Sequence, residues 1–414
     1  MRKVIIVLFS LLIVSELFSQ NDSASKALKI YISCSDCDMD FIRKEINYVN
    51  YVRDRHEAEV YIITTEQNSG SGGIIVTLDF IGQQSYAGMN DTLKISLRPD
   101  DTDDVIRNKS IAVLKAGLMR YVARTPYFDK ITITSSIEDN QDATQQPSDP
   151  WDSWVFKLSS DGYFNGEKTY KYNYLYSSFS ANRITEKWKY ESNIAYQFNK
   201  TKYIFEDDDT TIITASKSFY NNYFLARALN NHFSLGLSLG ANSSSYSNID
   251  FSVSGLPAIE YNVFPYSEST RKQLRIQYKI GFDYNDYHDT TIYNKTEEAL
   301  LMHSLSMTVM FVQKWGSLNV NLYGSNYFHD FSKNQLSING NADIKLFKGL
   351  SLTLYAYYAF VHNQLSLPKE GVTYEETITR QRELATTFNY YTSIGISYTF
   401  GSIYNNVVNP RFGD

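Results

Sequence analysis

Cys34 and Cys37 are the only two cysteines of the 414-residue chain, and their spacing makes them the first candidates for chemistry. A Cys-x-x-Cys pair between a strand and a helix is the arrangement of a thioredoxin-type redox site. The chain shows neither the cis-proline loop of such a site nor a second ligand pair that would complete a metal site. In an oxidising compartment such a pair forms a structural disulfide. We therefore expect Cys34 and Cys37 to form a disulfide, with no metal and no cofactor.

Histidine and serine occur together at His303-Ser304-Leu305-Ser306, the nearest match to the His–Ser pair of barrel phospholipases. Adjacent residues of a strand point to opposite faces, so neither His303 with Ser304 nor His303 with Ser306 can form a catalytic dyad. His288-Asp289 and His329-Asp330 match barrel proteases by residue type only, and the polarity of exposed loops explains them equally well. We predict that the protein is not an enzyme.

Arg53, Asp54 and Arg55 form a charged cluster close in sequence to the cysteines. Such a cluster is a candidate face for docking another protein, although a solvated face with local ion pairs is the commoner explanation.

Two other binding functions are disfavoured by the sequence. The loop Ser69–Gly73 lacks the lysine and the following helix of a phosphate-binding loop, so we expect a flexible hairpin there. The net charge of -6 is spread along the chain and forms no basic patch, so we expect no nucleic-acid partner.

The first 20 residues predict export. Met1–Gln20 begins with Arg2 and Lys3, continues with an apolar core and ends in small and polar residues around Ser19. This is the pattern of a secretory signal peptide, and its apolar core is shorter than the roughly 20 residues of a membrane helix. No cysteine follows the core directly, which disfavours a lipoprotein.

The stretch Arg382–Phe400 predicts how most of the chain is built, because its apolar and polar residues alternate with a period of two. It is longer than the usual strand of about five or six residues. One face suits lipid and the other is mostly small and polar. A strand of this kind in a membrane needs both neighbours paired, and we therefore predict a closed barrel.

From Trp151 onward the chain is rich in Tyr, Asn, Ser and Phe, and alternation continues to the C-terminal region. We predict twelve antiparallel strands, with 250–264 weakly patterned because Gly255 and Pro257 interrupt it. With an even number, one set of short connections lies on the same side of the membrane as the N-terminus: 181–185, 228–230, 265–270, 314–316 and 347–348. The predicted strands are 153–164, 168–180, 186–202, 210–227, 231–246, 250–264, 271–286, 299–313, 317–330, 335–346, 349–364 and 384–401.

Alternation also assigns the side chains to the two faces of these strands. The candidates for the lumen are Lys189, Glu191, Arg275, Gln277, Lys279, Asp283, Asn319, Asn321, Asp343 and Lys345. Facing lipid we expect Leu274, Ile276, Tyr278, Ile280, Phe282, Leu318, Val320, Leu322, Leu352, Leu354, Ala356, Tyr358 and Phe360. Trp154, Trp188, Tyr190, Tyr261 and Trp315 lie near strand ends, where an aromatic girdle belongs.

The apolar residues before the barrel, in 27–136, follow patterns that predict a small α+β domain. The expected order of its elements is strand, helix, three strands, helix. The order of its last four elements resembles the N-terminal domain of periplasmic TolB-like proteins. The segment 137–150 is polar and contains two prolines, so we expect a linker. The predicted barrel covers 151–403, and 404–414 is predicted to be a periplasmic tail.

Four stretches carry a resemblance that covers both halves: Asn47–Arg55, Glu260–Tyr266, Trp315–Ser317 and the tail Phe400–Phe412. In these the chain resembles an uncharacterised family of Bacteroidetes-type outer-membrane β-barrel proteins with an N-terminal periplasmic domain. The resemblance implies that the periplasmic domain and the barrel belong together. It implies the outer membrane of a Gram-negative bacterium as the location and brings no activity with it.

Two functions follow as hypotheses. The polar, mixed-charge lumen face predicts a narrow channel for ions or small polar solutes, in contact with outer-membrane lipid. The alternative is a non-enzymatic scaffold or envelope-assembly component, whose periplasmic domain docks a periplasmic protein through Arg53, Asp54 and Arg55. Large side chains such as Tyr355, Tyr357 and Tyr391 fill much of a small lumen, and this leaves the two hypotheses close to even.

Overall fold

A computed structural model describes most of the chain as two compact units. The described residues are 27–34, 37–70, 72–132, 149–205, 210–347, 349–370, 383–402, 404, 406, 408, 409 and 411. The N-terminal unit comprises Met1–Gln67, Ile74–Gln146 and Thr399–Asp414, and the sheet unit comprises Asn68–Gly73 and Pro147–Tyr398. The predicted signal peptide and nearly all of the predicted linker lie outside the described residues.

The N-terminal unit is built on a five-stranded sheet with the order β2-β1-β3-β4-β5. β1 pairs in parallel with β2 and β3, whereas β4 and β5 are antiparallel. The strands are β1 (Lys29–Ser33), β2 (Asn50–Tyr51), β3 (Val60–Asn68), β4 (Ile74–Gly82) and β5 (Asn90–Leu97). The predicted α+β class is confirmed, and β2 is an additional strand that sequence patterning missed.

Helices α2 (Met39–Glu45) and α3 (Asp103–Val122) complete this unit, and α3 packs against β5. α3 begins at Thr102, whose hydroxyl accepts a hydrogen bond from the Val105 N–H, and two acidic residues lie in its first turn. Its predicted apolar stripe is buried and meets Phe80 of β4 in a continuous core. Neither helix is both long and apolar enough to cross a membrane, and no other described helix is.

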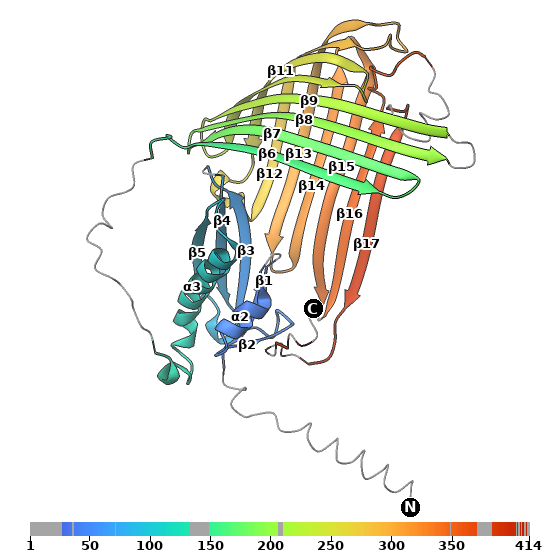
Figure 1. The fold of residues 1–414 in the computed structure, drawn as a ribbon. Helices are drawn as coiled ribbons and strands as arrows, with labels where there is room; N and C mark the ends of the chain where they lie inside the picture. The colour runs from blue at the N-terminus through green and yellow to red at the C-terminus, as the bar shows by residue number, and fades with distance from the viewer. Residues whose placement is uncertain are drawn as a thin grey trace, which may run out of the picture. The chain divides into compact units, whose positions relative to one another are not determined.

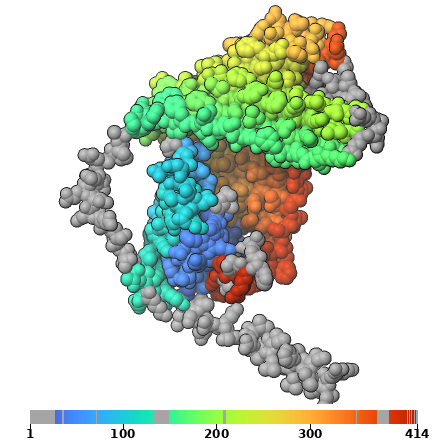
Figure 2. Space-filling view, viewed as in Figure 1, coloured from blue at the N-terminus to red at the C-terminus, as the bar shows by residue number. Residues whose placement is uncertain are grey.

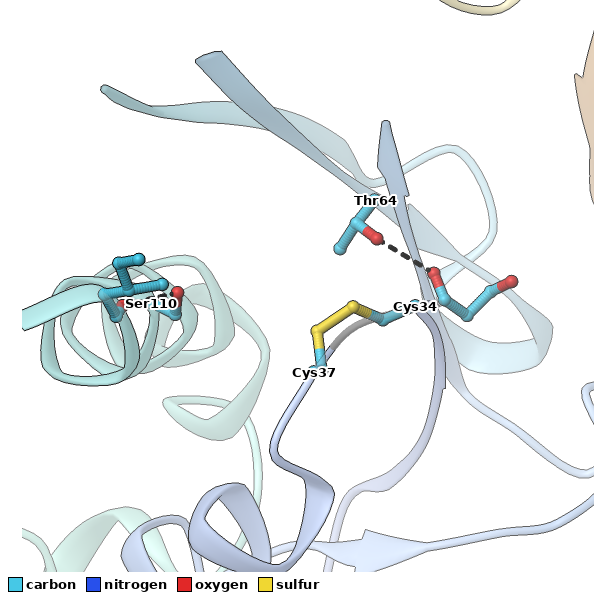
Figure 3. The surroundings of a disulfide bond; sticks show 6 residues. Cys34, Cys37, Thr64 and Ser110 are labelled. Carbon is cyan, nitrogen blue, oxygen red and sulfur yellow. Dashed lines mark hydrogen bonds between the residues drawn. A yellow bond between two sulfur atoms is a disulfide. The ribbon is translucent and has the colours of Figure 1, made fainter. Parts of the chain in front are cut away.

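The two cysteines form the predicted disulfide. Cys34 follows β1 and Cys37 precedes α2, with their Cα atoms 5.7 Å apart. Figure 3 shows the bond beside β3, where the Thr64 hydroxyl donates to the carbonyl oxygen of Ser33 at 3.3 Å. The disulfide therefore joins the end of the first strand to the start of the first helix.

The tail after the last strand packs within the N-terminal unit, at the β2 edge of its sheet. Val52 forms an antiparallel bridge with Tyr404. The backbone N–H of Tyr51 donates to Oδ1 of Asn406 at 2.7 Å, and Nδ2 of Asn406 donates to Oδ1 of the buried Asn50 at 2.9 Å. The edge of the sheet is thus satisfied by residues from the far end of the chain.

The sheet unit contains twelve antiparallel strands, each paired with its neighbour in sequence. The predicted count is confirmed, and 11 to 19 residues per strand are long enough for a membrane-spanning sheet. The strands are β6 (Trp154–Gly166), β7 (Tyr170–Ile184), β8 (Trp188–Phe205), β9 (Thr210–Ala228), β10 (Phe233–Ser244), β11 (Ile249–Asn262), β12 (Lys272–Tyr287), β13 (Glu297–Gln313), β14 (Gly316–Tyr327), β15 (Asp330–Phe347), β16 (Leu350–Val361) and β17 (Phe388–Tyr398).

Connections differ between the two ends of this sheet. One end carries 185–187, 229–232, 263–271, 314–315 and 348–349, and we call it the short-turn end. At the opposite end lie the longest connection, 362–387, and the connection 288–296, which is as long as 263–271. The described parts of these two loops pack together, because the N–H of Ile292 donates to the carbonyl oxygen of Leu367 at 2.8 Å and Thr291 is fully buried.

The predicted closure of the barrel is not observed. No register joins β6 to β17 among the described residues, so each of these strands has only one paired neighbour. Figure 1 shows that the sheet twists strongly, so that β6 to β9 run across the direction of β14 to β17. Both end strands are exposed, with Leu158 81% and Ile396 73% accessible.

Candidate functional site on the polar face of the sheet

The strand registers sort the side chains of the twelve strands onto two faces. Lys279 lies opposite Ser304, for example, whereas the next residue, Ile280, lies opposite His303. All ten residues predicted to face a lumen share one side, which we call the polar face. The residues predicted to face lipid share the other side, which we call the apolar face. That the polar face lines a lumen stays a prediction.

The most connected group on the polar face is centred on Glu260 of β11. Its Oε1 accepts from the Tyr266 hydroxyl at 3.0 Å, and its Oε2 accepts from Nε2 of Gln277 at 3.3 Å. Nε of Arg275 lies 3.8 Å from the same Oε2. Lys279, a diagonal neighbour of Glu260 on β12, donates to the Ser238 hydroxyl at 3.4 Å. One carboxylate therefore sits beside two cations.

Tyr266 holds this group from the short-turn end. It begins the short helix η4 (Tyr266–Glu268) in the β11–β12 connection. Burial raises the pKa of Tyr266 to about 12, and the nearby Glu260 carboxylate adds to that effect. The phenol is therefore neutral at physiological pH and remains a hydrogen-bond donor to Glu260, while the Ser234 hydroxyl lies 3.0 Å from its oxygen.

Lys189 and Glu191 form a second group, on β8. Their charged atoms are 3.0 Å apart. Glu191 also lines a pocket of about 430 Å³ that extends over β7 to β11. Its lining on the polar face includes the ring of Phe224 and six hydroxyl or amide side chains, Ser180, Asn182, Asn193, Asn222, Ser238 and Ser254. Such a surface offers both donors and acceptors to a hydrated ion or a small polar solute.

The remaining candidates lie apart from these two groups. On β15, Lys345 is 2.8 Å from Asp343. On β12, the Asp283 carboxylate accepts from Nδ2 of Asn285 at 3.1 Å. The polar face of the last strands carries bulky rings, with Tyr355 and Tyr391 edge to face at 5.4 Å. Charges of both signs therefore alternate along the polar face, and no single sign dominates the described pairs.

The histidines do not assemble with a nucleophile in the described residues. His303 lies on the apolar face, where its ring contacts Tyr278 and Phe328, while Ser304 is on the polar face. His288 pairs with Asp250 at 3.0 Å. No group of three or more metal-ligating side chains occurs in the described part of the chain.

The proposed docking residues of the N-terminal unit make local contacts. Nη1 of Arg53 donates to the carbonyl oxygen of Phe400 at 3.2 Å, so the tail covers part of this cluster. Oδ1 of Asp54 accepts from the N–H of His56 at 2.8 Å, and Nε of Arg55 lies 3.4 Å from Nε2 of His56. These residues lie in the N-terminal unit and belong to neither group on the polar face.

Glu260 is a charged residue of the polar face that sequence reasoning missed. Gly255 and Pro257 interrupt the alternation of its strand, so the faces beyond them could not be assigned from the pattern alone. In the structure β11 is continuous, and Glu260 lies opposite Gln277 of β12. Gln277 lies on the polar face, as predicted, so Glu260 lies there too. The signal available in the sequence was this pairing with β12.

Comparison with known proteins gives little beyond the structure itself. No family model and no curated protein matches the chain. Seven solved chains match it, among them one titled "NanC porin structure in rhombohedral crystal form". That structure is 11% identical, with 59% of this chain and 100% of the porin chain covered, and the TM-score is 0.28. A similarity at this score supports no inference about function.

Proposed function

We propose that the chain is an outer-membrane β-barrel protein whose polar face forms a narrow passage for ions or small polar solutes. The observation that carries this proposal is the separation of the two faces over twelve successive strands. Paired charges, amides and hydroxyls gather on one face, and Leu, Ile and Phe side chains gather on the other. A sheet with one apolar face and one polar face suits lipid on one side and water on the other.

This function requires β6 and β17 to pair in the membrane. Unpaired backbone N–H and C=O groups in hydrocarbon cost several kcal/mol each, so an open edge is not tolerated there. Twelve strands make β6 and β17 antiparallel, and their lengths of 13 and 11 residues are similar. Their apolar residues fall on the same face of the sheet when the pairings are followed from β6 to β17, because the four register shifts lie near strand ends.

Pairing of the end strands predicts a cross-link. The native cysteines are first removed as Cys34→Ser and Cys37→Ser. Ser160→Cys on β6 is then combined with one β17 substitution at a time: Tyr390→Cys, Thr392→Cys, Ile394→Cys or Ile396→Cys. At least one combination should form an intramolecular disulfide in membranes, detected by gel mobility with and without reductant. Cross-links only between two copies, or none, would contradict closure within one chain.

The channel itself predicts conductance with weak ion selectivity, because the charges of the polar face are paired. Purified protein in planar bilayers should give small stepwise currents. Glu260→Gln removes the carboxylate beside Arg275 and Lys279, so the reversal potential in a salt gradient should shift towards anion selectivity. The matched control is Glu297→Gln, which lies on the apolar face opposite Asp286 and should leave the reversal potential unchanged. Absence of any current would contradict the channel.

A scaffold role remains the second candidate, because the chain carries a folded N-terminal unit that a simple pore does not need. The tail already occupies part of the Arg53 surface, which leaves Asp54 and Arg55 as the charged groups for docking a periplasmic partner. Co-purification of a defined partner that is lost in Asp54→Asn, Arg55→Gln protein would support this role.

A further inference from the structure

Four lysines gather at one end of the apolar face, on β7, β8 and β9, which lie side by side in Figures 1 and 2. We call Lys171, Lys200, Lys202 and Lys217 the lysine patch. Lys171 lies directly opposite Lys202. Lys217 lies opposite Phe198, so it is a diagonal neighbour of Lys200. All four share the face of Tyr196 and Phe198, and they lie at the end of the strands away from the short turns.

The patch lies just beyond the apolar band of these strands. On β8 the apolar-face residues from Trp188 to Phe198 are mostly aromatic or aliphatic, with Ile194 near the middle. Lys200 is six residues further along the strand, which corresponds to about 20 Å at roughly 3.3 Å per residue. With a strand tilt of about 40°, Lys200 lies about 15 Å from the middle of a band about 25 Å tall. The ammonium groups therefore reach the level of lipid head groups.

Two cations at the opposite end of the same face, Arg183 and Arg227, are already partnered. Nη2 of Arg183 lies 2.6 Å from the Asp152 carboxylate, and the Arg227 guanidinium stacks on the Trp188 ring at 5.2 Å. Among the described residues, none of the four patch lysines takes part in an ion pair. The sequence that follows β8, 206–209, is acidic and lies outside the described residues. Like charges directly across a pair of strands repel each other, so Lys171 and Lys202 destabilise the sheet unless an anion lies between them.

We propose that the lysine patch binds the phosphate head group of a lipid in the outer leaflet. A phosphate carries up to two negative charges and three acceptor oxygens, which match a group of closely spaced ammonium donors. The acyl chains would lie along the exposed rings of Tyr196 and Phe219 below the patch. The inference rests on the proposed membrane-spanning function, because only that places the apolar face in lipid.

The test is native mass spectrometry of the full-length protein in non-ionic detergent with added dioleoyl phosphatidic acid. Wild-type protein should bind this lipid in preference to dioleoyl phosphatidylcholine. A lysine near an anionic lipid contributes about a factor of five in affinity, so Lys200→Gln, Lys202→Gln protein should bind about thirtyfold more weakly. Lys200→Arg, Lys202→Arg protein keeps the charge and should bind as the wild type does.

A matched control removes two lysines from the short-turn end. Lys187→Gln, Lys314→Gln protein has the same net charge as the double glutamine variant of the patch and should bind the lipid as tightly as the wild type. Three outcomes would overturn the proposal. These are equal binding of both lipids by the wild-type protein, equal loss of binding in the patch and control variants, and displacement of the lipid by inorganic phosphate at the same concentration.

Planar-bilayer currents from the same preparations separate the lysine patch from the membrane function. A protein that conducts without preferring phosphatidic acid refutes the patch alone, and a protein that never inserts refutes the membrane function as well.

Discussion

Replacing Ile280 or Leu354 with arginine is expected to lower the free energy of unfolding in lipid by about 2–4 kcal/mol. Ile280 is near the middle of β12 and Leu354 near the middle of β16, and both lie on the apolar face. A guanidinium placed there faces hydrocarbon close to the middle of the bilayer, where nothing pairs with it. The measurement is equilibrium unfolding in urea of protein folded into phospholipid vesicles.

The controls place the arginine on the polar face, at Gln277 of β12 and Asn321 of β14. Gln277→Arg places a guanidinium beside Glu260, and Asn321→Arg replaces a side chain that donates to the Thr308 hydroxyl at 2.8 Å. Both changes should stay within about 0.5 kcal/mol of wild type, as surface substitutions usually do. The opposite ranking would show that the polar face, and not the apolar face, contacts lipid, and would remove the basis of both the channel and the lysine patch.

Most of the sheet could be predicted from the sequence because alternation is a local signal. β12, β14 and β16 alternate without interruption, so their faces follow from the pattern alone. Their limits are less well marked, since the predicted strands 317–330 and 349–364 each run three residues past the ends of β14 and β16. β11 is the exception. Pro257 pairs with Leu237 of β10 but has no partner in the register with β12, as expected for a residue without an N–H.

The close approach of the β11 backbone explains why a glycine, Gly281, occupies its position on β12. A Cβ at Gly281 would lie 2.0 Å from the carbonyl oxygen of Gly255, so only glycine fits where β12 passes β11. This fit depends on two strands together, and no pattern within one strand reports it. The same limit applies to Glu260, whose face becomes clear only from its pairing with Gln277.

Long-range contacts were the other part that the sequence did not reveal. The bridge between Val52 and Tyr404 joins segments from opposite ends of the chain. β2, with two residues, is too short to produce a periodic signal. Closure of the barrel was inferred from the cost of open edges in lipid, a property of the membrane environment and not of the chain alone.

Phe80→Ala is expected to destabilise the N-terminal unit by about 3–5 kcal/mol, because it removes a large ring from the centre of the core. Phe80 is fully buried, and its ring lies against α3 so closely that a Cβ at Gly117 would be 2.2 Å from Cζ. Domains of this size have a total stability of about 5–15 kcal/mol, so the loss is a large part of it. Phe128→Ala is the matched control, since Phe128 is 43% exposed and its removal leaves no cavity.

The distribution of tryptophan allows the two units to be followed separately. Trp151, Trp154, Trp188 and Trp315 are the only tryptophans, and all lie in the sheet unit. Phe80→Ala should therefore make the N-terminal unit sensitive to protease while tryptophan fluorescence still reports a folded, inserted sheet. Loss of insertion in Phe80→Ala protein but not in Phe128→Ala protein would mean that the two units fold as one.

The same variant decides whether the N-terminal unit acts on the passage. If the unit is a scaffold, unfolding it by Phe80→Ala or deleting 27–135 should abolish the co-purification of partners and leave single-channel conductance unchanged. A sharp rise in conductance in both variants would instead show that the unit plugs the passage. The plug would need a surface that matches the polar face, whereas the apolar stripe of α3 is already covered by the unit's own sheet. We therefore expect unchanged conductance, measured in planar bilayers with Phe128→Ala protein as the reference.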